Sequence, residues 1–97
     1  MKNNERIVFE HFEYRIIEIK DGVNDLDEAV YSYRLEVWNP TVDKGWEFLS
    51  GYNSEDGFIG RYDSSLINEA TNNPVGELSR LIKKDRIERR KFFTYNY

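Results

Sequence analysis

His11 is the only histidine in the chain and therefore the first candidate for acid–base catalysis. A histidine works as a general base when a second group orients it and a pocket brings the substrate within hydrogen-bond reach. If residues 7–13 are extended, His11 shares one strand face with Ile7 and Phe9. This placement favours a half-buried structural role for His11 over a catalytic one.

Residues 21–28 are rich in carboxylates and superficially resemble a calcium-binding loop. Aligned with the EF-hand pattern from its first residue, the segment has Val23 at a ligand position and Leu26 in place of the turn glycine. Ser32 stands where the closing bidentate glutamate belongs. We interpret the segment as a solvated hairpin loop that opens with the turn dipeptide Asp21-Gly22.

No other pattern points to catalysis or to cofactor binding. The chain has no cysteine and a single histidine, so it cannot assemble a conventional zinc site. Gly51, Gly57 and Gly60 lack the spacing of a phosphate-binding loop, and no serine lies in a nucleophile-elbow pattern. We therefore predict no catalytic residue, no metal site and no cofactor, and we predict that the protein is not an enzyme.

The aromatic residues are the chain's most distinctive feature. Fifteen aromatic side chains argue against disorder, and many fall in or beside the predicted strands. A small sheet has two faces and one predicted helix to cover them, so some rings should stay exposed, and exposed aromatics are preferred interface residues. An alternative is that the rings fill the core in place of scarce leucine and methionine. The protein-interface candidates are Tyr31, Tyr33, Trp38, Trp46 and Tyr52.

Charge is distributed unevenly along the chain. Residues 1–79 carry seven lysines and arginines against sixteen acidic residues, whereas residues 80–97 carry seven against two. An acidic body with a basic end indicates attraction within the fold, between two copies, or towards an anionic partner. Basic residues followed by aromatics also suit nucleic acid, since cations neutralise phosphates and rings stack on bases. The nucleic-acid candidates are Arg86, Arg89, Arg90 and Lys91.

The first two thirds of the chain read as strands. Residues 12–19 have apolar side chains on both faces, and residues 7–10 either extend this strand or form a separate one. Ala29–Trp38 alternates cleanly between apolar and polar positions, which predicts a strand with one buried face. Residues 45–49 and 58–62 predict two more short strands around a loop at residues 51–57.

The last third predicts a helix. Asp63 is a suitable N-cap, and Pro74 interrupts that helix and can restart one at its first turn. Val75, Leu78, Leu81 and Ile82 keep helical spacing, whereas Ile87 lies about half a turn off their stripe. We therefore predict that the helix ends between residues 84 and 88, and that residues 89–97 form a final strand. A helix that continues to residue 93 is the rival interpretation.

These elements predict a single α+β domain over residues 1–97, with an antiparallel sheet of four to five strands and a C-terminal helix packed on one face. The absence of cysteine, of a signal peptide and of an apolar run approaching ~20 residues predicts a cytoplasmic protein with no membrane partner. A short, cysteine-free chain rich in Asn and Tyr is typical of small phage or mobile-element proteins.

The leading functional hypothesis is a non-enzymatic inhibitor or adaptor that binds another protein through an aromatic sheet face. Homodimer formation is a natural corollary, because the acidic body of one copy complements the basic end of another. The alternative is a nucleic-acid-associated regulator that uses the basic C-terminal segment. We place it second because the acidic body repels a polyanion.

Overall fold

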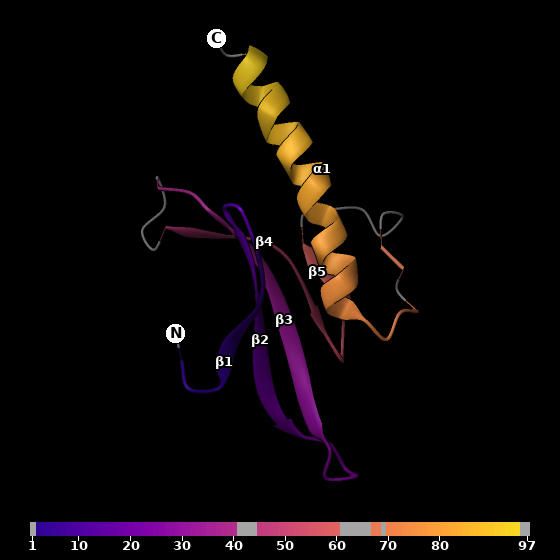
Figure 1. Cartoon of the computed structure of the whole chain (residues 1–97). Helices are drawn as coiled ribbons and strands as arrows, with labels where there is room; N and C mark the ends of the chain where they lie inside the picture. Colours follow the sequence, from indigo (N-terminus) through magenta and orange to yellow (C-terminus); the bar gives the residue numbers. More distant parts are fainter. Residues whose placement is uncertain (1, 41–44, 61–66, 69, 96–97) are drawn as a thin grey trace.

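The computed structural model describes residues 2–40, 45–60, 67–68 and 70–95 of the chain. In this part of the chain, five antiparallel strands form one open sheet in sequence order, and a helix packs against one sheet face (Figure 1). The predicted α+β class is therefore confirmed. The elements are β1 (Glu5–His11), β2 (Tyr14–Val23), β3 (Ala29–Trp38), β4 (Trp46–Asn53), β5 (Gly57–Gly60) and α1 (Pro74–Tyr95).

The core lies between the sheet and α1. Side chains alternate between the two faces along each strand, so one set of apolar residues turns towards the helix. We call this side the helix face, and the opposite side the open face. The buried cluster on the helix face contains Tyr14, Ile16, Leu35, Val37 and Leu49 from the strands and Leu78, Leu81 and Ile82 from α1.

The strand Ala29–Trp38 has the predicted bounds, whereas β2 begins and ends later than predicted. Phe12 belongs to the turn between β1 and β2, with a φ of 55°. Asp21-Gly22 is part of β2 and not a turn, because a register shift between Lys20 and Gly22, with Gly22 at a φ of 118°, lets the strand continue to Val23.

The strands β4 and β5 are also displaced from their predicted positions. The predicted loop at residues 51–57 is mostly strand, since β4 continues to Asn53 and β5 starts at Gly57. The Asn53 side chain shortens the turn by accepting hydrogen bonds from the backbone N–H groups of Glu55 and Asp56, at 3.0 and 2.7 Å. A register shift opposite Leu35 bends β4.

The predicted half-buried position of His11 is wrong. A register shift between Ile7 and Phe9 breaks the alternation along β1, so these two residues lie on opposite faces. Phe9 and His11 follow their partners Ile16 and Tyr14 onto the helix face, where the His11 side chain is exposed. Residues 7–10 belong to the separate strand β1.

The helix begins at Pro74, as predicted for a proline in the first turn. Asn73 caps it, since its Oδ1 accepts a hydrogen bond from the Gly76 N–H at 3.1 Å. The predicted N-cap at Asp63 lies outside the described residues. Residues 67, 68 and 70–73, which are described, are not helical.

The predicted C-terminal strand is wrong, because α1 continues to Tyr95. The rival interpretation, a continuous helix, is the correct one. The helix is 22 residues long, and its last turns project beyond the ends of the strands (Figure 1). The helix face that packs on the sheet continues from Ile82 with two polar residues, Asp85 and Arg89. Ile87 lies off this face. No helix in the described residues is long and apolar enough to cross a membrane.

Candidate functional site

Three aromatic rings gather on the open face, where β3 and β4 pair. Trp38 faces Trp46 across the strands, and the ring centroids lie 5.3 Å apart in an edge-to-face arrangement. Phe48 follows two residues after Trp46 and therefore lies on the same face. Trp38 is 49% exposed and Phe48 is 45% exposed, while Trp46 is partly buried. We call Trp38, Trp46 and Phe48 the aromatic cluster.

Two glycines give these rings their positions. The Trp38 ring lies directly over Gly45, which has a φ of 77°, and a Cβ at that position would overlap the indole. The Phe48 ring lies beside Gly51, where a Cβ would be 3.2 Å from the Phe48 Cε2 atom. Both rings therefore lie close to glycine positions, where a side chain would collide with the ring or crowd it.

A row of charged residues connects the aromatic cluster to the far edge of the sheet. The Arg15 guanidinium lies 3.8 Å from the centroid of the Trp46 ring, and its Nε donates a 2.8 Å hydrogen bond to Glu36. Arg34 pairs with Glu36 at 3.4 Å and with Glu5 at 2.9 Å. The row joins residues of β1, β2, β3 and β4, and it fixes Arg15 in place against the Trp46 ring.

Ile17 shows that this row covers apolar surface. Its side chain is fully buried although it lies on the open face, with Ile7 and Arg34 as its cross-strand neighbours. Long arginine side chains bury their methylene stems while the guanidinium stays near water. The charged row thus covers Ile17, and the aromatic cluster lies at one end of this row.

The five interface candidates from the sequence do not form one surface. Tyr33 pairs with Tyr52 on the helix face, where Tyr31 also lies. The Tyr33 hydroxyl donates a 3.0 Å hydrogen bond to Glu18, and burial raises its pKa to about 12. Trp38 and Trp46 lie together on the open face. Phe48 was not among the interface candidates, although its spacing from Trp46 places both on one face.

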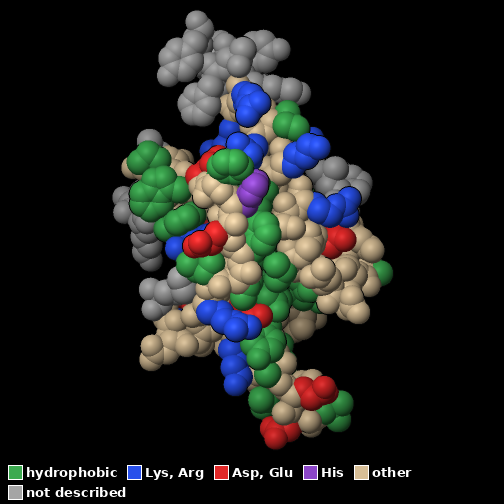
Figure 2. All heavy atoms as spheres, viewed as in Figure 1, with side chains coloured by type: hydrophobic (Ala, Val, Ile, Leu, Met, Phe, Trp, Pro, Cys, Tyr) green, Lys and Arg blue, Asp and Glu red, His purple; other side chains and the backbone are tan. Residues whose placement is uncertain are grey.

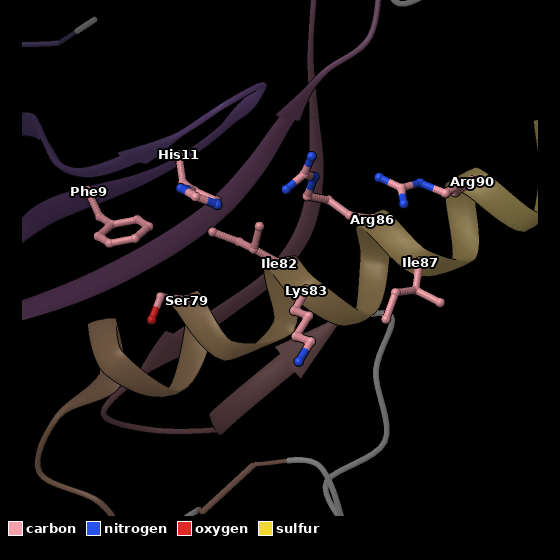
Figure 3. Close-up of a pocket in the computed structure, with 8 residues that line it drawn as sticks. All are labelled: Phe9, His11, Ser79, Ile82, Lys83, Arg86, Ile87 and Arg90. Carbon is pink, nitrogen blue, oxygen red and sulfur yellow. The ribbon is translucent and has the colours of Figure 1, made fainter.

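A second surface lies between β1 and α1, on the helix face. A groove of about 430 Å³ is lined by Phe9 and His11 from β1 and by Ser79, Ile82, Lys83, Arg86, Ile87 and Arg90 from α1. In Figure 3 the β1 side chains point towards the helix, and Ile82 and Arg86 point back towards them. We call this the basic groove.

The nucleic-acid candidates do not lie on one side of α1. Arg86 and Arg90 line the basic groove, whereas Arg89 points to the sheet and pairs with Asp85 at 2.6 Å and with Glu47 at 3.4 Å. Lys91 lies in α1, but its side chain falls outside the described part of the structure. Arg86, Arg89 and Arg90 therefore do not present a single basic stripe to a phosphate backbone.

Asp85 is a buried charge that the sequence argument did not identify. It is 1% exposed, and its Oδ2 accepts 2.6 Å hydrogen bonds from the Tyr14 hydroxyl and from the Arg89 Nε. Burial raises the pKa of Tyr14 well above its ordinary value, and the Asp85 carboxylate raises it further. This network joins the helix to the sheet, and the four-residue spacing of Asp85 and Arg89 is the sequence signal for it.

Neither surface carries a catalytic or metal-binding arrangement among the residues described. His11 contacts the rings of Phe9 and Phe12, with ring centroids 6.4 and 4.5 Å away, and no carboxylate partner is described for it. No group of three or more His, Cys, Asp or Glu side chains is placed to hold a metal ion in the described residues. No protein-family model, curated protein or solved structure matches this chain.

Proposed function

We propose that the protein is a non-enzymatic binding module, an inhibitor or adaptor, that contacts another protein through the aromatic cluster. The observation that carries the proposal is the exposure of Trp38 and Phe48, which are 49% and 45% exposed on a sheet face that no described element covers. Tryptophan and arginine dominate the binding energy of known interfaces, and Arg15 lies against Trp46 at this position.

Rigidity supports the same proposal. Binding costs less entropy when the contacting side chains are already ordered in the free protein. Here the rings lie against Gly45 and Gly51, and the Arg15 side chain is fixed by Glu36. The cluster is therefore prepared to bind a partner without rearrangement of the sheet.

Phe48→Ser and Tyr31→Ser form a matched pair for the test. Both replace an exposed aromatic residue in a strand, at 45% and 39% exposure, but they lie on opposite sheet faces. A photoreactive amino acid at position 48 would first trap the partner in the source cells. The affinity of the purified partner for each variant would then be measured by calorimetry.

We expect Phe48→Ser to weaken binding by about 30-fold or more, as for an interface hot spot. Tyr31→Ser should change the affinity by less than about threefold, as for residues outside the contact. Both variants should keep the circular dichroism spectrum of the wild-type protein. If position 48 traps no protein, or if Phe48→Ser binds as tightly as Tyr31→Ser, the aromatic cluster is not the interface.

A further inference from the structure

The basic groove combines an apolar floor with cationic side chains. Phe9, Ile82 and Ile87 supply the apolar part, and Ile87 is 47% exposed. Lys83 and Arg86 have no carboxylate partner among the described residues. Outside the groove, by contrast, the described cations of the helix are paired, as in Arg80–Glu77, Lys84–Glu88 and Arg89–Asp85.

Arg86 is held at the mouth of the groove by an unusual turn. Phe12 has a φ of 55°, a left-handed conformation that a bulky residue rarely adopts, and its ring is 70% exposed. The Arg86 guanidinium lies 4.0 Å from the centroid of this ring, and the His11 ring packs edge-on against it. A strained backbone conformation persists where the surrounding structure holds it. Here the strained turn at Phe12 places an aromatic ring against the Arg86 guanidinium, beside the basic groove.

The tip of the β2–β3 hairpin has the complementary chemistry. Leu26 is 78% exposed and lies between Asp25 and Asp27. The tip is ordered by Asn24, whose Oδ1 accepts hydrogen bonds from the N–H groups of Leu26 and Glu28, at 2.9 and 3.0 Å. An apolar side chain is thus presented on a hydrogen-bonded turn and flanked by carboxylates.

We infer that the basic groove binds the β2–β3 hairpin tip of a second copy of this chain. Leu26 enters the groove and covers Phe9, Ile82 and Ile87, while the neighbouring carboxylates approach Lys83 and Arg86. The contact cannot form within one copy, because the tip and the projecting half of α1 lie at opposite ends of the molecule (Figure 1). Figure 2 shows the same separation, with Lys and Arg gathered near the histidine and acidic residues at the lower tip.

The inference is independent of the proposed function, since the groove and the tip share no residue with the aromatic cluster. Two copies that exchange tips reciprocally form a closed dimer, and a one-way contact adds further copies head to tail. Charge complementarity of this kind weakens as salt is raised, because screening shortens the range of the attraction.

The test is sedimentation velocity of the full chain over a concentration series, at about 0.05 M and about 0.5 M salt. We expect the wild-type protein to associate at low salt and to dissociate at high salt. Arg86→Glu and Asp25→Lys should each weaken the association at least about tenfold, a change typical of breaking one buried charged contact. An equimolar mixture of these two variants should associate, because one retains an intact tip and the other an intact groove.

Lys84→Glu and Glu55→Lys are the matched controls, since they reverse a charge outside the groove and at the other hairpin tip. Both should associate like the wild type, and so should Phe48→Ser.

Lys83→Glu replaces Arg86→Glu if the latter fails to fold. The inference is overturned if the wild-type protein is monomeric at low salt, if the mixture of variants stays monomeric, or if Phe48→Ser abolishes association. It is also overturned if the groove instead binds a labelled single-stranded oligonucleotide and Arg86→Glu removes that binding.

Discussion

At the scale of single residues, the most consequential arrangement is the buried carboxylate of Asp85 between a tyrosine and an arginine. A buried charge is destabilising unless its hydrogen-bonding capacity is satisfied. Asp85 accepts from both Tyr14 and Arg89, and Arg89 reaches on to Glu47. The network therefore fixes where α1 lies along β2 and β4, in addition to contributing to stability.

The raised pKa of Tyr14 predicts a loss of stability in alkaline solution. An unfolded tyrosine ionises near pH 10, whereas burial and the Asp85 carboxylate keep the folded Tyr14 protonated above that value. Above about pH 10 the unfolded chain therefore holds fewer protons than the folded one, and the free energy of unfolding falls as pH rises. The stability that protonated Tyr14 contributes is therefore fully present below pH ~10 and is lost as pH rises further.

Urea denaturation at a series of pH values from about 9 to about 11 measures this effect. We expect the free energy of unfolding of Tyr14→Phe to fall less steeply with pH than that of the wild type, by up to about 1.4 kcal/mol per pH unit. Other tyrosines and lysines titrate in the same range, so the comparison between the two proteins isolates Tyr14. Parallel curves for the two proteins would show that Tyr14 ionises as easily in the folded state as in the unfolded one.

At the scale of elements, the two halves of α1 have different roles. The first half carries Leu78, Leu81 and Ile82 into the core, where each is at most 2% exposed. The second half contacts the sheet through Asp85 and Arg89 and carries the groove residues Arg86, Ile87 and Arg90. We predict that the first half contributes most of the apolar packing energy, and that the exposed apolar side chain of the second half, Ile87, contributes little.

Leu81→Ala and Ile87→Ala compare the two halves with one type of substitution. Leu81→Ala leaves a cavity in the core and should lower the free energy of unfolding by about 2–5 kcal/mol. Ile87→Ala removes a side chain that is 47% exposed and should lower it by less than about 1 kcal/mol. Chemical denaturation of both variants measures the difference. A large effect of Ile87→Ala would mean that the Ile87 side chain is packed in solution.

The elements also show what the sequence can and cannot predict. The strand Ala29–Trp38 was predicted to the residue because its alternation is unbroken and Pro40 follows soon after it. The bounds of the other strands shifted because register shifts on β1, β2 and β4 change which residues face the core. Such irregularities depend on cross-strand partners, which a local pattern does not contain.

The helix end was predicted wrongly for a related reason. The core stripe of α1 continues through Asp85 and Arg89, two charged residues that an apolar pattern cannot follow. In the same way, the prediction named Trp38 and Trp46 but combined them with tyrosines of the opposite face. The alternation of Ala29–Trp38 places Trp38 with Arg34 and Glu36, so the strand pattern itself separates Trp38 from Tyr31 and Tyr33.

At the scale of the whole molecule, the sheet extends well beyond its core. β1 begins opposite Ile19, and the pairing of β4 with β3 ends at Tyr33, so the outer part of the β2–β3 hairpin has no other strand beside it. Lys20 and the residues that follow it in β2 are exposed. A two-stranded ribbon without a covered face is marginally stable in water, so the hairpin end should open independently of the core.

Hydrogen exchange measures this difference directly. In dilute protein at high salt, the amides of Ile16 and Leu35 should exchange only by global unfolding, at a cost of about 5–10 kcal/mol. The amides near Gly22 and Val30 should exchange many times faster. If the hairpin tip binds a second copy, protection near the tip should rise with protein concentration at low salt while protection of the core amides stays constant. Equal protection along the whole hairpin under dilute conditions would instead mean that the outer ribbon is as stable as the core.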